Sequence, residues 1–233
     1  NLILIIVCIL ALIPVWLILI SSVTQEDSLV TYGYRFWPLK FSFESYKYLF
    51  AKGSIVIRAY RNTVLSTLIG TLFCTVSVAL YAYPLSRTDF KGKGFFTFFS
   101  FFTMLFNGGI VSFYVICRQV LGIGNTLEAL YLPLSFSAYW VIIMRTFYKT
   151  NVPESILESA RIDGAGEWYT YLKIVIPLSK PGLATVALFA AVGLWNNFFN
   201  CMLLNDDSQW YNLQYTIYKM LNNIRFLKEN AAQ

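Results

Sequence analysis

Five long runs of apolar residues, separated by polar segments, constrain this chain more than any other feature. The runs cover residues 2–23, 62–85, 95–120, 127–148 and 182–204. A bilayer core of ~30 Å requires ~20 apolar residues per spanning helix, so every run is long enough to cross a membrane. Their length and the absence of strict alternation exclude barrel strands. The sequence therefore predicts an all-α, polytopic transmembrane helical bundle that forms a single domain over residues 1–233.

The composition excludes a water-soluble protein. Hydrophobic residues make up 57% of the chain and charged residues 13%, with a mean hydropathy of +0.57. Soluble domains contain about 25% charged residues, so lipid must cover much of this surface. The net charge of +6 comes from Lys and Arg in the loops, which favours contacts with lipid headgroups over nucleic-acid binding.

No catalytic or metal site is predicted. The cysteines lie within or at the ends of apolar runs without metal-type spacing, and the chain has no histidine. We therefore expect neither a metal site nor a disulfide framework. The sequence also lacks a phosphate-binding loop and any paired nucleophile and base, so we expect the chain not to be an enzyme.

The orientation in the membrane stays open from charge alone. The short loop 87–94 contains three basic residues, which favours the cytoplasm, but segment 24–61 contains six and would then lie outside. Asn1 leads directly into apolar residues without a basic flank. We interpret it as the interior of a longer protein's first apolar segment.

The long polar segment 149–181 has the pattern of two short helices joined by a turn. Asn151 is a plausible N-cap, Pro153 suits the first turn, and Glu154 favours the positive end of the helix dipole. Gly164 lies where such a helix would end. A second helix is predicted over about 167–175, ending before a proline. Ile156, Leu157 and Ala160 recur at helical spacing and predict one apolar face.

The same segment resembles the EAA loop of ABC importer permeases. That pattern is Glu-Ala-Ala, three residues, Gly, nine residues, then Ile-x-Leu-Pro, and here it reads Glu158-Ser159-Ala160, Gly164 and Ile174-Val175-Ile176-Pro177. The departures, Ser159 for Ala and Ile176 for Leu, are small changes in size. The alternative is a helix at the membrane surface that only caps the bundle.

The resemblance implies that loop 151–177 is the docking surface for a cytoplasmic ATPase and transmits its motion to the spans. The implied coupling residues are Glu158, Ser159, Ala160, Arg161, Asp163, Gly164, Ile174 and Pro177. The fold would be that of a type I importer permease in a bacterial cell (inner) membrane. Its implied partners are a second, homologous permease subunit, two ATPase subunits that bind ATP and Mg, and an extracytoplasmic solute-binding protein. No cofactor is expected on this chain.

Further residues resemble the carbohydrate branch of these permeases. Three stretches are similar to maltose-type permeases: Thr146-Phe147, the segment 160–165, and Gly193 to Asn196. A fourth stretch, Phe106 to Ile110 with Tyr114, is similar to permeases for complex oligosaccharides and to lipoprotein-associated permeases. Such subunits usually have six spans, so we expect a sixth after Gln233. An importer of amino acids or peptides, a non-transporting membrane scaffold and an intramembrane enzyme are the competing hypotheses.

Six polar or aromatic residues are candidates for a substrate pathway. They are Trp195, Asn196, Asn197, Asn200, Asn107 and Tyr114. An unpaired amide is costly in hydrocarbon, so amides within spans usually face the bundle or a water-filled path. A flat indole ring beside amides also suits sugar binding. The alternative for the amides is packing between helices, and for the indole an interfacial belt.

Overall fold

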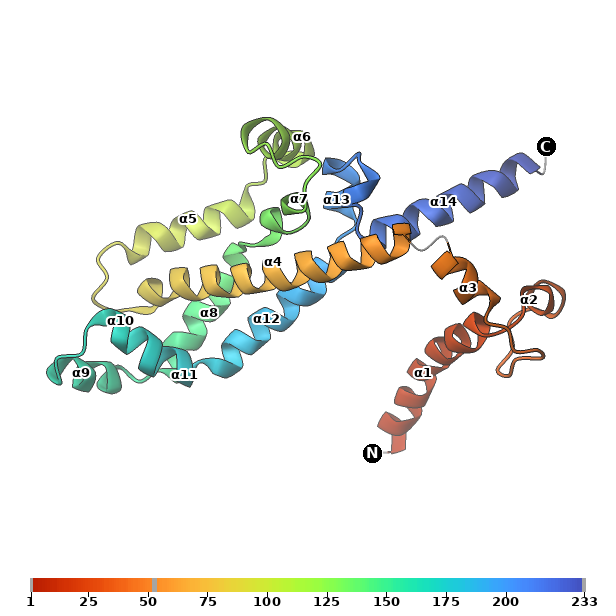
Figure 1. The fold of residues 1–233 in the computed structure, drawn as a ribbon. Helices are drawn as coiled ribbons and strands as arrows, with labels where there is room; N and C mark the ends of the chain where they lie inside the picture. The colour runs from red at the N-terminus through yellow and green to blue at the C-terminus, as the bar shows by residue number, and fades with distance from the viewer. Residues whose placement is uncertain (1, 52–53, 232–233) are drawn as a thin grey trace. The chain divides into compact units, whose positions relative to one another are not determined.

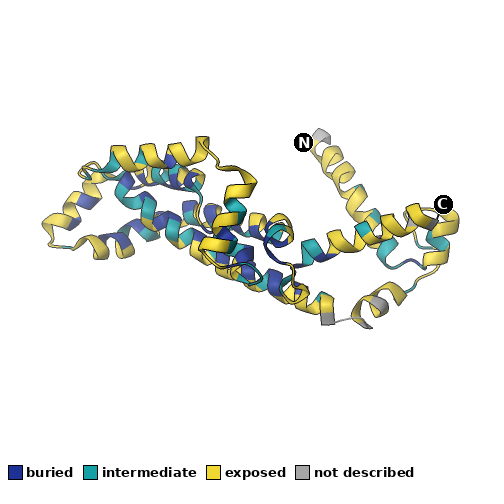
Figure 2. Cartoon of the chain, turned by 90° about the horizontal axis from the view of Figure 1, so that it is seen from above, coloured by how far each residue is buried: buried dark blue, intermediate teal, exposed yellow. Residues whose placement is uncertain are grey.

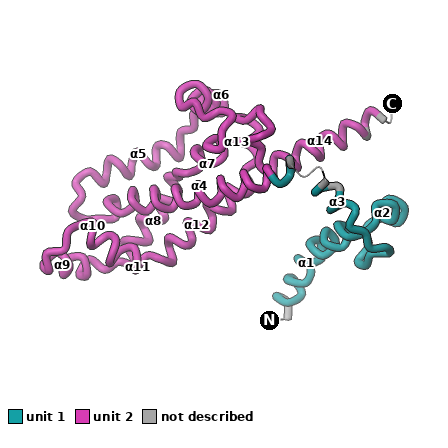
Figure 3. The backbone as a smooth tube through the Cα atoms, in the orientation of Figure 1, with its two compact units in different colours: residues 1–57 teal, residues 58–233 magenta. Residues whose placement is uncertain are grey.

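The described residues, 2–51 and 54–231, form helices in this computed structural model, with one isolated antiparallel bridge between Thr24 and Phe41. The chain divides into two compact units, residues 1–57 and residues 58–233, where the sequence predicts one domain (Figure 3). Each unit is described by itself.

The first unit consists of one membrane-length helix followed by a folded polar segment. Its helices are α1 (Leu2–Ser22), α2 (Glu26–Tyr32) and α3 (Glu44–Ala51). The α1 helix continues through Pro14 and exposes most of its apolar side chains. The segment after it folds back, because Trp16 Nε1 donates to the Phe36 carbonyl at 3.1 Å and the Trp16 ring meets Trp37 edge-on.

The second unit is a bundle around one long helix, α4 (Ser54–Ser86), whose first residues precede the unit boundary (Figure 1). The other elements are α5 (Lys93–Leu105), α6 (Gly109–Val115), η1 (Ile116–Val120), α7 (Glu128–Tyr131), η2 (Leu132–Leu134), α8 (Ala138–Asn151), α9 (Glu154–Ile162), α10 (Glu167–Thr170), η3 (Tyr171–Val175), α11 (Ile176–Leu178), α12 (Lys180–Trp195), α13 (Phe199–Leu204), η4 (Ser208–Trp210) and α14 (Leu213–Ala231). Of these, η1 and η3 are π-helical turns, and η2 and η4 are 3₁₀ turns.

Each apolar run is expected to form one uninterrupted helix, but several of them contain breaks. Among the described residues, two helices are long and apolar enough to span a membrane, 4–22 and 55–86. Three bent pairs account for the rest, with bends of 112°, 49° and 76°. The 95–120 run breaks between α5 and α6, where Gly109 adopts φ +79°. The 127–148 run begins with α7 and η2, and the 182–204 run is interrupted after Trp195.

The core of the second unit lies between α4, α8 and α12. Its buried side chains include Val78, Ala82 and Leu85 of α4, Val141, Met144 and Tyr148 of α8, and Val186 and Ala190 of α12. The α5 helix packs on α8 and exposes many of its phenylalanines. Buried residues gather between the helices while exposed, mainly apolar ones cover their outer faces (Figure 2), which is the pattern of a bundle surrounded by lipid.

Polar contacts to other elements concentrate at the two ends of α4. Near its start, Asn62 Nδ2 donates to the carbonyls of Gln209 and Tyr211 at 2.8 and 3.1 Å. Near its end, the Tyr83 hydroxyl donates to Glu167 at 3.1 Å. At about 1.5 Å per residue, the stretch between Asn62 and Tyr83 is about 32 Å long, which matches the ~30 Å hydrocarbon core.

Gly70 allows α4 to approach its neighbours closely. A Cβ atom at this position would lie 2.8 Å from Tyr131 Cβ and 2.8 Å from Leu194 Cδ1.

We predict that Gly70→Ala lowers the thermal unfolding midpoint in detergent, since overpacking a well-packed core costs about 1–3 kcal/mol. Gly94→Ala is the matched control, because a Cβ there meets nothing within 4 Å. Equal midpoints for the two variants would show that α4 does not pack this closely.

Candidate functional site

The short helix α9 ends in a Schellman motif built on Gly164. The Ala165 N–H donates to the Ala160 carbonyl at 2.9 Å, and the Gly164 N–H donates to Arg161 at 3.1 Å. Gly164 adopts φ +77°, a left-handed conformation that costs other L-residues about 1–2 kcal/mol. The predicted turn therefore lies at the predicted glycine. Asn151, however, is the last residue of α8, and Pro153 occupies the N-cap position instead.

The two faces of α9 differ sharply in exposure. Leu157 and Ala160 are 9% and 7% exposed and pack against the rest of the chain, so the apolar face predicted from the spacing points inward. Ile156 is more exposed, at 39%. The outward side includes Glu158, Ser159 and Ile162, the last of which is 86% exposed. Among the described residues, Ile162 is the most exposed of the large apolar side chains.

The loop between α4 and α5 holds both ends of α9. The Thr88 hydroxyl donates to Glu154 in the first turn, and Arg161 Nη2 in the last turn donates to Asp89 Oδ2 at 2.6 Å. Arg87 Nη2 contacts the same Asp89 oxygen at 3.3 Å. The Arg161 guanidinium, with help from Arg87, lowers the pKa of the Asp89 carboxyl below its ordinary value. We call the ion pairs of Arg87, Asp89, Arg161 and Glu167 the clasp.

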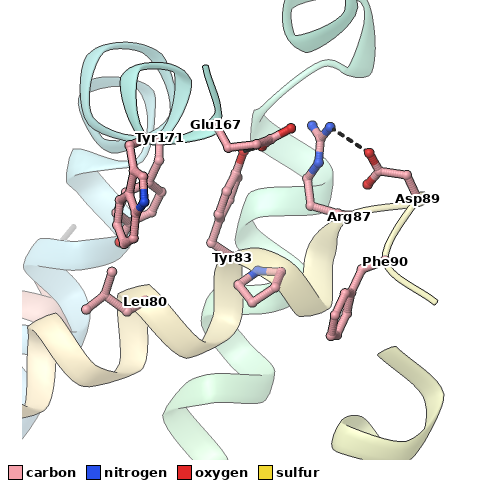
Figure 4. Close-up of a pocket in the computed structure, with 9 residues that line it drawn as sticks. Leu80, Tyr83, Arg87, Asp89, Phe90, Glu167 and Tyr171 are labelled. Carbon is pink, nitrogen blue, oxygen red and sulfur yellow. Dashed lines mark hydrogen bonds and ion pairs between the residues drawn. The ribbon is translucent and has the colours of Figure 1, made fainter. Parts of the chain in front are cut away.

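The clasp also contacts α10, and its residues form part of the wall of a cavity. Arg161 Nη2 also contacts Glu167 Oε1 at 3.2 Å, and Glu167 Oε2 accepts from Tyr83 of α4. A cavity of about 460 Å³ lies between α4, the loop and α10–η3, with Tyr83, Arg87, Asp89 and Glu167 in its wall (Figure 4). Arg161, one of the implied coupling residues, forms its ion pairs within the chain. Asp163 has no ion pair among the described residues.

The remaining loop residues lie in a helix that contains a π-helical turn. The Ile176 N–H donates to the Tyr171 carbonyl, five residues earlier. Ile174 is half-buried and Pro177 is exposed. The helical structure continues through Pro177 to Leu178 as α11, so the predicted end before this proline is wrong. The bend of 76° follows at Ser179.

At the opposite end of the bundle, buried and half-buried asparagines join segments that are distant in sequence. Asn197 Nδ2 donates to the Leu130 carbonyl at 3.0 Å, and the Asn212 amide donates to the Asn197 carbonyl. Asn205 exchanges hydrogen bonds with the Thr126 backbone at 3.3 and 3.2 Å. Together with Asn62, these residues form what we call the amide belt. Asn62, Asn205 and Asn212 carry no sequence signal for this role, because their partners belong to loops elsewhere in the chain.

The candidate pathway residues of the fifth run differ in their surroundings. Trp195 is half-buried and packs edge-on against Tyr60, with ring centroids 6.0 Å apart. Asn196 is exposed, and its side chain donates only to the Val192 carbonyl of its own helix. Asn197 belongs to the amide belt. Asn200 is 6% exposed, and its side-chain nitrogen has no hydrogen-bond partner in the described part of the chain.

Asn107 and Tyr114 lie at the break in the third run. Asn107 Oδ1 accepts from the Gly109 N–H at 2.9 Å and so supports the turn into α6. Arg118 Nη1 donates to the Tyr114 hydroxyl at 2.8 Å, and Arg118 also pairs with Asp206. Within 2–51 and 54–231, no hydrogen bond or ring contact joins this pair to Trp195 or Asn196.

The family model "Binding-protein-dependent transport system inner membrane component" matches residues 1–217. Among curated relatives, the chain is similar to the Polygalacturonan/rhamnogalacturonan transport system permease protein YtcP of Bacillus subtilis (strain 168), with 36% identity over 88% of this chain and 70% of the relative. It is also similar to Protein LplC of the same strain, with 34% identity over 85% of this chain and 67% of the relative.

Among solved structures, the chain resembles a subunit in the crystal structure of a bacterial ABC transporter involved in the import of the acidic polysaccharide alginate. The TM-score is 0.85 at 29% sequence identity, and the match covers 94% of this chain and 77% of that one. The likeness therefore extends over both compact units and over the EAA-like segment.

We predict that Gly164→Ala speeds hydrogen exchange at the end of α9. The left-handed conformation opposes a Cβ by about 1–2 kcal/mol, so amides held by the Schellman bonds, such as that of Ala165, would exchange roughly 5- to 30-fold faster. Gly164→Asn is the matched comparison, because asparagine tolerates this conformation better. Hydrogen exchange with mass spectrometry measures both. Equal exchange in the alanine variant and the wild type would contradict the assignment.

Proposed function

This chain belongs to the family of binding-protein-dependent transport system inner membrane components, and on that premise we propose that it imports a carbohydrate and that α9 docks its ATPase. The membership rests on a family match over residues 1–217. The chain is accordingly a non-catalytic, membrane-embedded permease subunit of an ABC importer, whose ATPase is a separate subunit.

The substrate proposed for this importer is an oligosaccharide. Support comes from the relatives, of which one is named for polygalacturonan and rhamnogalacturonan transport and one solved structure is described by alginate import. The carbohydrate would arrive on an extracytoplasmic solute-binding protein. A second, homologous permease subunit would complete the transmembrane path, and two ATPase subunits would bind ATP and Mg.

The observation that supports coupling most directly is the outward side of α9. The helix packs on the rest of the chain through its buried face, and the clasp joins its last turn to the loop after α4, while Glu158, Ser159 and Ile162 stay exposed on its outward side. A short helix that exposes Ile162 at 86% and Ile156 at 39% among polar residues suits insertion into a groove of a partner. In this proposal Arg161 and Ala160 contribute to coupling through contacts within the chain, because they hold α9 in place, and not through contacts with the ATPase.

Docking of α9 to the ATPase also orients the chain. The proposal places α9, the loop 87–92 and the end of α4 in the cytoplasm, and the amide belt at the outer face. The basic residues Arg87, Lys91 and Lys93 then lie on the cytoplasmic side, as the charge rule favours. Both compact units belong to one permease domain in this proposal, with five spans over residues 2–23, 62–85, 95–120, 127–148 and 182–204.

For the substrate pathway, we propose Trp195 and Asn196 ahead of the other candidates. Asn196 has an exposed amide whose oxygen accepts no side-chain hydrogen bond from the described residues, beside an indole ring that is half-buried. Asn197 is bonded to the distant Leu130 carbonyl, and Asn200 is buried beside it, with its backbone N–H donating to Asn197 Oδ1. Asn107 and Tyr114 have local partners and remain secondary candidates.

We predict that Ile162→Glu prevents association with the ATPase while membrane insertion is retained. Burial of an isoleucine contributes about 1.5–3 kcal/mol, and an unpaired carboxylate in the same groove adds a desolvation cost. Co-purification of the ATPase with the detergent-extracted permease measures the effect. Val30→Glu, at an 82% exposed residue of α2, is the control and should retain the ATPase. Retention by both variants would disprove docking through α9.

We predict that Asn196→Leu lowers uptake without loss of assembly. Removal of one amide that hydrogen-bonds a sugar hydroxyl costs about 0.5–1.5 kcal/mol, or roughly 2- to 13-fold in affinity. The measurement is uptake of the transported oligosaccharide into proteoliposomes containing the complete complex. Asn222→Leu on α14, whose side chain makes no hydrogen bond with the described residues, is the matched control. Wild-type uptake by Asn196→Leu would remove this residue from the pathway.

A further inference from the structure

The covalent connections of α9 do little to fix its direction. Before the helix, the backbone of Pro153 is extended at ψ 135°, and after it the left-handed Gly164 and the extended Gly166 at ψ 159° lead into α10. Such junctions change direction easily, because hinges form where a few terminal residues absorb rotations. The non-covalent contacts of α9 must therefore determine how its movement reaches the spans.

The loop after α4 is built as an extension of that helix. Arg145 of α8 donates from Nε to the Leu85 carbonyl at 3.0 Å and so caps the last turn of α4. The Arg87 N–H donates to the Pro84 carbonyl at 3.2 Å, and Lys93 Nζ donates to Thr88 at 3.0 Å. A displacement of Asp89 is consequently a displacement of the end of α4.

Asp89 occupies the central position of the clasp. A single carboxylate oxygen accepts from Arg87 on the α4 side and from Arg161 on the α9 side. The Arg87 side chain is 11% exposed, whereas Asp89 and Arg161 are 47% and 54% exposed. Exposed ion pairs contribute little to folding stability. The pair Asp89–Arg161 therefore adds little to folding stability, and what distinguishes it is that it joins α9 to the loop after α4.

We propose that Asp89 is a positioning residue for energy coupling, which transmits the movement of α9 directly to the end of α4 through Arg161. The inference rests on the proposed docking of α9 to the ATPase. It adds a route that does not pass through the chain connections to α8 and α10. It also assigns a role to the loop 87–92, which lies far from the EAA-like segment in sequence.

The test follows the response of two segments to ATP. The complete importer in lipid nanodiscs is compared without nucleotide and after trapping with Mg-ATP and vanadate, and hydrogen exchange is measured in α9 and in residues 84–92. In the wild type both segments should respond. In Asp89→Asn, α9 should still respond, while the response of residues 84–92 falls roughly 2- to 30-fold, as expected for a coupling residue.

Three further variants test the route through the ion pair. Arg161→Gln should cause the same loss, and the double variant should lose no more than either single one, because both remove one interaction. Asp89→Glu retains the charge and should restore part of the response. Lys91→Gln, a charge change in the same loop at a residue that forms no ion pair with the described part of the chain, should behave as the wild type.

Two outcomes separate this inference from the proposed docking. If both segments respond in Asp89→Asn as they do in the wild type, the role of Asp89 is disproved while docking stands. If α9 itself does not respond to Mg-ATP and vanadate in the wild type, the docking of α9 fails, and the role of Asp89 fails with it.

Discussion

The absence of water in a bilayer is the constraint on which the rest of this structure depends. Polar groups within the hydrocarbon must find partners inside the protein. Along α4, the hydroxyls of Thr63, Ser66 and Thr75 bond to carbonyls of the same helix, while contacts between elements gather near Asn62 and Tyr83. The apolar length of α4 thus separates two polar ends. Neutral amide hydrogen bonds predominate at one end and ion pairs at the other.

The two ends differ in how readily their contacts can change. The amide belt is neutral and largely buried, with Asn62, Asn205 and Asn212 at 1–2% exposure, so breaking it would leave unpaired polar groups at a high cost. The clasp is ionic and half exposed, so water can replace its partners cheaply. In the proposed orientation, a rigid outer end and an adjustable inner end would suit a permease whose motion starts at the cytoplasmic side.

Local features of this chain could be predicted from sequence, whereas contacts between distant segments could not. The helix ending at Gly164 follows from residue preferences within one segment. The pairing of Asp89 with Arg161 and of Asn205 with Thr126 depends on tertiary packing that no local pattern reveals. The third run shows a related limit, since its apolar composition predicts one helix over 95–120 although Asn107 and Gly109 build a turn within it.

The π-helical turn at Tyr171–Val175 gives a physical meaning to the spacing within the EAA-like segment. Such a turn contains one residue more than the α-helix it interrupts, and each residue corresponds to about 100° of rotation around the axis. An extra residue in an uninterrupted α-helix would turn every following side chain by that angle, whereas the wider π-helical turn takes up the extra residue. The residues of α11 therefore keep the direction that a segment without this turn would give them, although nine positions separate Gly164 from Ile174.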